Sequence, residues 1–436
     1  MKGYKNLISL GMVLIMALSF YMLIDTRATT AKNYKTYIET ARDFAKQAIY
    51  KDALQNYNQA LLIDNSLELN LEIGEIYVKA DDEYAAIGWG EKMIETFPHS
   101  SEAYDYLLKL YHKNNDFNRC FVLYNIIQKR KVSSKTISKI MKEIEHAFYY
   151  GEAYDNVGVF SEGYCAVEYE GEWGLANEIG EKTAPFKFKS VGNLIDGLAP
   201  IQTKDGECYY IDFEGNKKMA ILIKGEITDI SSVVGDVYAV KEGFEWSFYN
   251  KEYKKLNGGY KNVSLLANGV VAVEEDGKWV ILNDKFEKIS DQKYTEVVQD
   301  ERGIIYRNDT IFVNKDGKYY MIDNTGKEIT QKTFLNAKTF LDATYAAVET
   351  DKGWTFVNSK GEFVFKDAYF EEANSFSNGF AAVQKSGQWG YIDIDGNVAI
   401  DFQFKEVKDF NASGCAFVKN EDIWQLVRLY SKNYES

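Results

Sequence analysis

The pattern of apolar and polar residues divides the chain into three stretches with different periods. An uncharged apolar run covers residues 7–24 and follows Lys2 and Lys5. A helix of about 18 residues is roughly 27 Å long, which is enough to cross the hydrocarbon core of a bilayer. The apolar period is then about 3.6 residues over 34–150, which predicts helices, and about 2 over 151–436, which predicts strands.

The apolar run at the N-terminus predicts a membrane segment. A cleaved signal peptide would have an apolar region of about 7–15 residues and a small-residue cleavage site, which Arg27–Ala31 resembles only weakly. We therefore favour an uncleaved signal anchor with a short cytoplasmic end (1–6), a transmembrane helix (7–24) and a linker (25–33). With the basic end inside, the sequence predicts a single-pass membrane protein whose bulk is extracytoplasmic.

Residues 34–150 can be laid out as three helical hairpins of about 34 residues each. Small and aromatic residues recur at corresponding helix positions: Ala41, Ala53, Tyr57, Gly74, Tyr77, Ala86, Tyr104 and Tyr111. Small residues let paired helices approach closely, and aromatic rings fill the space between hairpins. This pattern resembles the tetratricopeptide repeat, which implies an α-solenoid. Residues 135–150 are expected to form its capping helix.

The tetratricopeptide-like resemblance implies a concave groove that binds peptides along the first helix of each hairpin. The basic residues at the corresponding positions are Arg42, Lys46, Lys79, Lys109 and Lys113. They make an acidic peptide or C-terminus a candidate partner, although a solvated helix face also carries Lys and Arg. Ile38 and Leu71 stand where carboxylate-binding members carry polar residues, which argues against a specific carboxylate clamp.

Residues 151–436 contain an internal repeat marked by an anchor residue. The anchors are Trp173, Cys208, Trp246, Trp279, Tyr319, Trp354, Trp389 and Trp424, at spacings of 35, 38, 33, 40, 35, 35 and 35 residues. In one unit, Ala381–Gln384, Trp389–Asp393 and Asn397–Ile400 read as three strands. A three-stranded sheet cannot bury a face alone, so we expect the anchors to pack between neighbouring units.

Turn residues follow each anchor at fixed distances. Short polar residues that can cap a turn backbone stand four positions later: Asn177, Asp212, Asn250, Asn283, Asp323, Asn358 and Asp393. Glycines that can supply a positive φ stand seven positions later in five units: Gly180, Gly215, Gly326, Gly361 and Gly396.

The Trp-Gly dipeptides at 173–174 and 389–390 resemble the WG-containing repeat of bacterial proteins, a family often found near a signal or membrane segment. The resemblance covers about 280 residues, although several units depart from the dipeptide (Cys208-Tyr209, Trp246-Ser247 and Tyr319-Tyr320). It implies a β-repeat interaction module of the bacterial cell envelope, with no catalytic residues to carry over.

The two ends of the β-array are complementary in sequence. Tyr154–Phe160 matches the end of a later unit, Phe404–Phe410, and the last unit stops soon after its second strand. This offset favours a propeller-like ring of about eight three-stranded units. Because about 35 residues is short for a four-stranded blade, an open β-solenoid is the alternative.

Composition narrows the possible functions. A net charge of −14 argues against a nucleic acid partner. The four cysteines lack CxxC spacing, which argues against a disulfide framework or a structural zinc site. All three histidines (His99, His112 and His146) precede the β-repeats, so the β-repeats have no histidine for acid–base or metal chemistry. Asp393–Gly396 resembles the start of a calcium loop but lacks the further ligands. There is also no nucleotide-binding motif, so we expect no metal, no cofactor and no catalytic site.

These observations lead to one main hypothesis and two alternatives. The main hypothesis is a membrane-anchored extracytoplasmic interaction or scaffold protein that binds peptide or protein partners through its repeat surfaces. A cell-wall or glycan-binding module, in which exposed Tyr and Trp stack on sugars, is the first alternative. An envelope enzyme is the less favoured second.

Overall fold

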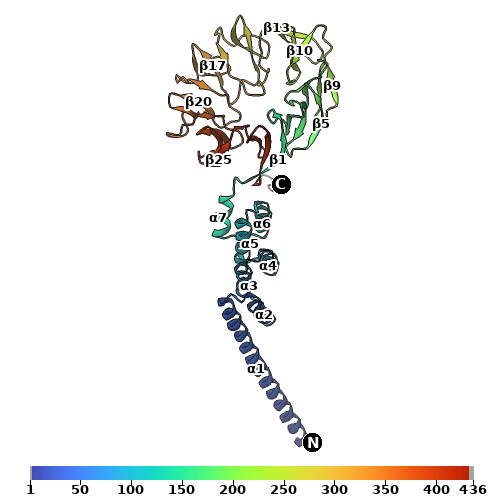
Figure 1. Cartoon of the computed structure of the whole chain (residues 1–436), viewed down its shortest axis with the longest axis vertical. Coiled ribbons are helices and arrows are strands. Elements are labelled where there is room, and N and C mark those ends of the chain that lie inside the picture. The colour runs from blue at the N-terminus through green and yellow to red at the C-terminus, as the bar shows by residue number, and fades with distance from the viewer. Residues whose placement is uncertain (1, 432–436) are drawn as a thin grey trace. The chain divides into compact units, whose positions relative to one another are not determined.

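A computed structural model describes residues 2–431, apart from the side chains of residues 2–15, 17, 23 and 24. The chain separates into two compact units, Met1–Glu145 and His146–Ser436 (Figure 1). The first unit is helical and the second is a β-propeller. Each is described by itself.

The helical unit contains seven helices joined by short turns. They are α1 (Lys2–Lys46), α2 (Tyr50–Leu61), α3 (Leu67–Lys79), α4 (Glu83–Thr96), α5 (Ser101–Lys113), α6 (Phe117–Arg130) and α7 (Lys135–Glu143). The first three hairpins share one turn geometry, because Ala48, Asp81 and Asn115 all have φ between 54° and 58°. The predicted capping helix at 135–150 is shorter than expected, since α7 ends at Glu143.

Small residues allow the helices to approach as the sequence predicted. Ala41, Ala53 and Ala60 are fully buried where α1 and α2 meet. A Cβ atom on Gly74 of α3 would lie 2.7 Å from the ring of Tyr106 on α5. This position therefore accepts only glycine without a shift of the tyrosine.

The prediction of a membrane anchor is wrong. Residues 7–24 belong to α1, which continues without a break into the polar helix of the first hairpin. Within the described residues, no helix is both long enough and apolar enough to cross a membrane. This finding corrects both the transmembrane helix and the single-pass localisation. Residues 7–15, 17, 23 and 24 of that prediction lie outside the residues whose side chains are described.

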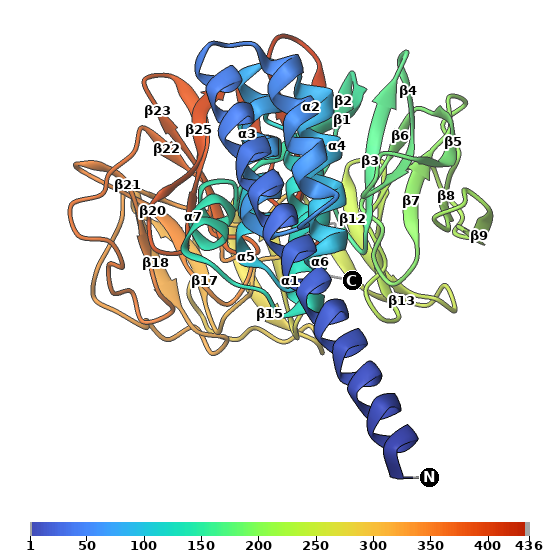
Figure 2. The ribbon, with the colours of Figure 1, turned by 90° about the horizontal axis from the view of Figure 1, so that it is seen from below.

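The propeller contains eight antiparallel sheets arranged around a centre (Figures 1 and 2). Sheets 1 to 3 have four strands each. Sheet 1 is β2 (Asn156–Val157), β3 (Tyr164–Tyr169), β4 (Glu172–Asn177) and β5 (Lys182–Phe188). Sheet 2 is β6 (Ser190–Val191), β7 (Ala199–Gln202), β8 (Cys208–Ile211) and β9 (Lys217–Ala220). Sheet 3 is β10 (Ile227–Ile230), β11 (Val237–Glu242), β12 (Glu245–Asn250) and β13 (Lys255–Tyr260).

Sheets 4 to 6 are smaller and sheets 7 and 8 again have four strands. Sheet 4 is β14 (Val270–Glu275) and β15 (Lys278–Asn283). Sheet 5 is β16 (Glu296–Val297), β17 (Ile311–Lys315) and β18 (Lys318–Ile322), and sheet 6 is β19 (Asn336–Ala337), β20 (Ala346–Thr350) and β21 (Gly353–Val357). Sheet 7 is β22 (Glu372–Ala373), β23 (Phe380–Lys385), β24 (Gln388–Asp393) and β25 (Val398–Phe404). Sheet 8 is β26 (Glu406–Val407), β27 (Cys415–Lys419) and β28 (Trp424–Leu429), completed by β1 (Phe148–Tyr154).

The ring is closed by the first strand of the propeller. β1 pairs antiparallel with β28, from Phe148 opposite Leu429 to Tyr154 opposite Trp424. A hydrophobic cluster that includes Tyr154, Phe417 and Trp424 then joins sheet 8 to sheet 1. The open β-solenoid is therefore excluded. The prediction of uniform three-stranded units is also wrong, because the sheets have two to four strands.

The turn residues behave as the sequence predicted. In all seven units the side-chain Oδ1 of the polar residue accepts N–H bonds from the second and fourth residues that follow. The five turn glycines have φ between 72° and 86°. Each of these seven units thus closes the turn after its anchor strand with the same pair of hydrogen bonds from backbone N–H groups to one side-chain oxygen.

Candidate functional site

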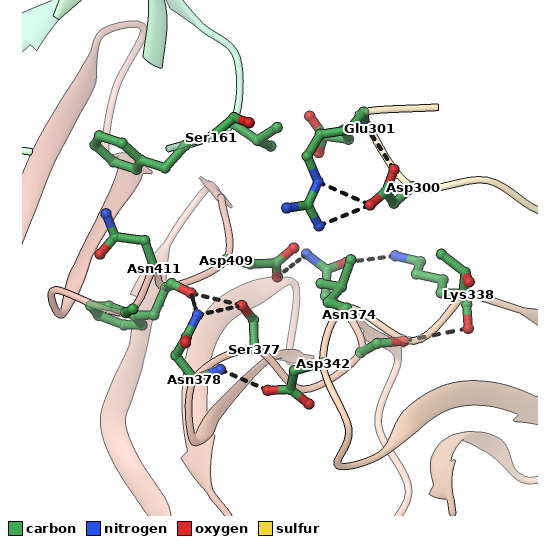
Figure 3. A pocket seen from close by; sticks show the side chains of 18 of the residues that line it. Ser161, Asp300, Glu301, Lys338, Asp342, Asn374, Ser377, Asn378, Asp409 and Asn411 are labelled. Atoms are coloured by element: carbon green, nitrogen blue, oxygen red, sulfur yellow. Dashed lines mark hydrogen bonds and ion pairs between the residues drawn. The ribbon is translucent and has the colours of Figure 1, made fainter. Parts of the chain in front are cut away.

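A cavity of about 580 Å³ opens at the centre of the propeller (Figure 3). It is lined mainly by the loops that follow the two-residue strands β2, β16, β19, β22 and β26. These loops belong to sheets 1, 5, 6, 7 and 8. Five sheets therefore contribute to one concave site, which we call the axial cavity.

The loop 299–303 of sheet 5 crosses the centre of the ring. The main-chain oxygen of Glu301 accepts a hydrogen bond from Asn193 of sheet 2 at 3.2 Å. Its carboxylate accepts one from Lys408 of sheet 8 at 2.6 Å. Gly303 accepts a bond from the N–H of Leu265, beside sheet 4, at 2.8 Å. Contacts with three other sheets fix this loop at the axis.

A buried carboxylate holds the crossing loop in shape. The Asp300 side chain is 1% exposed and lies 2.9 Å from Arg302 and 3.8 Å from Arg307. It also accepts the N–H groups of Arg302 and Ile304, both at 2.9 Å. Burial, together with the charge of Arg302, lowers the pKa of Arg307 below its ordinary value.

A chain of three polar side chains from sheets 6, 7 and 8 lines one wall of the cavity. Lys338 donates to the Asn374 side-chain oxygen at 2.7 Å, and Asn374 donates to Asp409 at 3.0 Å (Figure 3). Burial lowers the pKa of Lys338, whose nitrogen lies 5.3 Å from the ring centre of Trp354. Burial raises the pKa of Asp409 to about 6, against the opposing effect of the Asn374 hydrogen bond.

Three further carboxylates on the cavity wall bind neutral groups. Glu162 accepts the N–H groups of Asp196 and Gly197, at 2.8 and 2.9 Å. Glu178 accepts bonds from the side chains of Asn411 and Ser413. Asp342 accepts the N–H of Asn378 at 2.9 Å and that of Thr344 at 2.8 Å. These bonds link loops of neighbouring sheets and orient the carboxylates around the cavity.

The predicted groove residues lie on three helices of the helical unit. Arg42 of α1 binds the Glu72 carboxylate of α3, with Nε 3.0 Å from Oε2. Lys46 lies 3.4 Å from Asp43, while Lys79, Lys109 and Lys113 are exposed. In the described part of the chain, no hydrogen bond or ion pair joins any two of the five. Exposed acidic residues share the same helices: Glu68, Glu75 and Glu102.

The eight repeat anchors lie on corresponding strands of the eight sheets. They stand on β4, β8, β12, β15, β18, β21, β24 and β28. Each belongs to a different hydrophobic cluster between its own sheet and the next. None of the eight, all of which the structure describes, is exposed.

Sequence reasoning did not identify the axial cavity. Its key residues follow the first strand of each unit, where the eight units carry Gly158, Gly192, Ser231, Ser264, Val298, Lys338, Asn374 and Lys408. Small or apolar residues occupy this position in the first five units, and Lys or Asn in the last three. An alignment of the units at that position would have shown the contrast.

The described residues offer no ready metal site. Among them, no group of three or more His, Cys, Asp or Glu side chains is placed to hold a metal ion.

Comparison with known protein families supports the repeat. Residues 153–173, 173–208, 354–389 and 389–424 match the family described as WG containing repeat. No curated protein matches the sequence. The tetratricopeptide-like region has no family match among these findings.

Solved structures with a similar chain path share little sequence with this protein. BamB from Moraxella catarrhalis is 12% identical with a TM-score of 0.41, over 65% of this chain and 100% of its own. Hsv2p from Kluyveromyces lactis is 11% identical with a TM-score of 0.37, over 57% and 95%. PorZ from Porphyromonas gingivalis is 12% identical with a TM-score of 0.34, over 62% and 42%. Residues 153–208 and 354–424 of the β-propeller therefore carry WG-containing repeats, on the evidence of the family match.

Proposed function

We propose that the protein is a non-enzymatic scaffold that binds protein partners, and that a segment of a partner docks in the axial cavity. The observation that carries this proposal is the construction of the cavity itself. Loops from five sheets meet there, and bonds between sheets hold their polar groups in place. A concave site with fixed polar groups is suited to binding, because little conformational entropy is lost when a ligand enters.

The burial of the anchors does not favour the glycan-binding alternative. Stacking on a sugar needs an accessible aromatic face, whereas the anchor side chains are buried in, or half-buried against, the clusters between sheets. The helical hairpins remain a second proposed partner surface. There, Lys79, Lys109 and Lys113 are the exposed members of the predicted peptide groove.

The test compares three forms of the full chain as bait for cell extract from the source organism. The Ala412→Trp variant places a large side chain in the cavity wall. The Lys285→Trp variant places the same side chain on an exposed turn of sheet 4 and serves as the control. We expect the wild type and the control to retain a common protein that the Ala412→Trp variant loses. Retention of every bound protein by all three forms would contradict the role of the cavity.

A second set of variants tests the helical surface. Charge reversal of Lys79, Lys109 and Lys113 to Glu is expected to release any partner that docks on α3 and α5. Reversal of Glu68, Glu75 and Glu102 to Lys on the same helices is the matched control. If neither set changes the retained proteins, the helical groove has no part in binding.

A further inference from the structure

The axial cavity has an excess of acidic side chains. Eight charged residues line it, of which six are acidic and two are basic. The basic residues are Arg302 and Lys338. Lys408 forms an ion pair with Glu301 of the cavity wall and is a third cation nearby.

The cations near the cavity leave most of the carboxylates without an ionic partner. Arg302 and Arg307 both pair with Asp300, and Lys408 pairs with Glu301. Lys338 donates to the neutral side chain of Asn374. Among the described residues, Glu162, Glu178, Asp342 and Asp409 therefore accept hydrogen bonds only from neutral groups.

The placement of these four carboxylates indicates the size of the cation that would suit them. They come from the loops of sheets 1, 6 and 8 and surround a space of about 580 Å³. No three acidic, histidine or cysteine side chains within the described residues are close enough to form a metal site. An organic cation with several charges along an extended chain fits this spacing better than a single ion does.

Of these four carboxylates, Asp409 is the one whose charge a bound cation would stabilise most. It is partly buried in the cavity wall, and Glu301 adds a second negative charge nearby. Figure 3 shows its carboxylate between Asn374 and the loop that carries Asp300 and Glu301. A lysine ammonium or arginine guanidinium that entered from the cavity would replace the lost hydration with a charge-assisted hydrogen bond.

We infer that the occupant of the axial cavity is a basic peptide segment, one Lys or Arg side chain of which reaches Asp409. This inference rests on the proposed function. A free polyamine offers the same cationic chemistry, so the experiment includes one.

The experiment measures fluorescence anisotropy of a labelled Gly-Lys-Arg-Lys-Gly peptide with the full-length protein at pH 7.5. A Gly-Gln-Gln-Gln-Gly peptide is the uncharged probe, and spermine is the competitor. The Asp409→Asn variant keeps an oxygen that can accept the Asn374 bond. The Asp284→Asn variant makes the same change of charge on an exposed turn of sheet 4 and is its control.

We expect Asp409→Asn to weaken binding of the basic peptide at least tenfold and Asp284→Asn to change it less than twofold. The uncharged peptide should bind at least tenfold more weakly. Equal binding of the basic peptide by Asp409→Asn and Asp284→Asn would overturn the inference, and so would binding that survives Ala412→Trp. Either result would mean that the net charge of −14 attracts the peptide without a specific site. Spermine that binds as tightly as the peptide would overturn the peptide as the occupant.

The two proposals fail in different ways. If a partner is lost with Ala412→Trp but the basic peptide does not bind, the scaffold function stands and the cationic occupant is wrong. If Ala412→Trp retains every partner, the function of the cavity itself is wrong, whatever the peptide does.

Discussion

The Ser413 hydroxyl donates a 2.6 Å hydrogen bond to the carboxylate of Glu178, although the two residues are 235 positions apart. The second carboxylate oxygen accepts a bond from Asn411 at 2.9 Å, and the Cys415 thiol donates to the Glu178 main-chain oxygen at 3.3 Å. Sheets 8 and 1 are therefore joined by side chains as well as by the apolar cluster. One residue of sheet 1 thus reinforces the seam of the ring.

Removal of this carboxylate should weaken the ring. We expect Glu178→Ala to lower the free energy of unfolding by about 1–3 kcal/mol, because two polar groups of sheet 8 lose their acceptor. Urea denaturation of the full chain, followed by Trp fluorescence, measures the change. Asp284→Ala is the control, since Asp284 holds the corresponding turn position of sheet 4 and is exposed. Equal losses in the two variants would show that Glu178 has no special role.

The glycine of the Trp-Gly dipeptide is required by the outer strand. A Cβ atom on Gly390 would lie 2.7 Å from the main-chain oxygen of Ile400, where the pairing of β24 with β25 shifts register. We expect Gly390→Ala to destabilise the protein by about 1–3 kcal/mol through overpacking. Gly387→Ala is unsuitable as a control because its φ is 74°. Lys360→Ala, at an exposed position of a turn, is suitable.

In sheet 3 the glycine lies on the outer strand instead of next to the anchor residue. It carries Ser247 where sheets 1 and 7 carry this glycine, and the facing strand β13 carries Gly258, whose Cβ would overlap the Ser247 hydroxyl. We expect Gly258→Ala to destabilise the protein and the added change Ser247→Gly to recover part of the loss. A double-mutant cycle measures the coupling. Additive effects would mean that the two positions do not compensate each other.

Asp409 should make stability depend on pH. Its pKa rises from an ordinary 3.8 to about 6 on folding, because burial and Glu301 outweigh Asn374, Lys338 and Lys408. The folded state therefore binds the proton more tightly, and this contribution falls as pH rises from about 4 to 6. We expect Asp409→Asn to be more stable than the wild type by about 1–3 kcal/mol at pH 7 and to lose that advantage near pH 4. Urea denaturation at both pH values tests this, and a difference that does not vary with pH would contradict it.

Arg42 has a structural partner that bears on its predicted role in peptide binding. Glu72 accepts from Arg42 and also from the Tyr57 hydroxyl at 2.9 Å. The Arg42 bond lowers the pKa of Glu72 despite burial, so this contribution is present at neutral pH and declines as pH falls through the lowered pKa. We expect Glu72→Ala to cost about 1–3 kcal/mol.

Thermal unfolding followed by circular dichroism measures the loss at Glu72. Glu75→Ala, at an exposed position of the same helix, is its control. If the two variants melt alike, the Arg42–Glu72–Tyr57 cluster does not stabilise the helical unit. In that case Arg42 remains free to act in a groove.

Features that repeat along the sequence were predictable, and features that depend on one unit were not. The turn-capping residues and the match of Tyr154–Phe160 to a unit end could be read directly, because the same backbone geometry recurs at fixed spacing. The strand count was not predictable. Sheets 4 to 6 replace a regular outer strand with isolated bridges such as Leu282 to Lys288 and Tyr319 to Phe334, and local pattern does not distinguish the two.

The axial cavity escaped prediction for a different reason. Its polar chain joins Lys338, Asn374 and Asp409 from three consecutive units about 35 residues apart, and only the packing of sheets 6, 7 and 8 side by side brings them together. The apolar run at 7–24 gives the opposite case. Taken alone it predicts a membrane span, but it is part of a 45-residue helix that continues into polar sequence.

The pairing of β1 with β28 has a consequence for biosynthesis. Gln425 reaches the main-chain oxygen of Gly151 across 274 positions, so a ribosome working at roughly 5–20 residues per second needs on the order of 15–55 seconds to supply the partner. Throughout that interval the nascent propeller has an unpaired strand edge and an uncovered apolar face on sheet 1. A message truncated before the codon for Trp424 would leave both permanently open, and its product would be a substrate for chaperones and proteases.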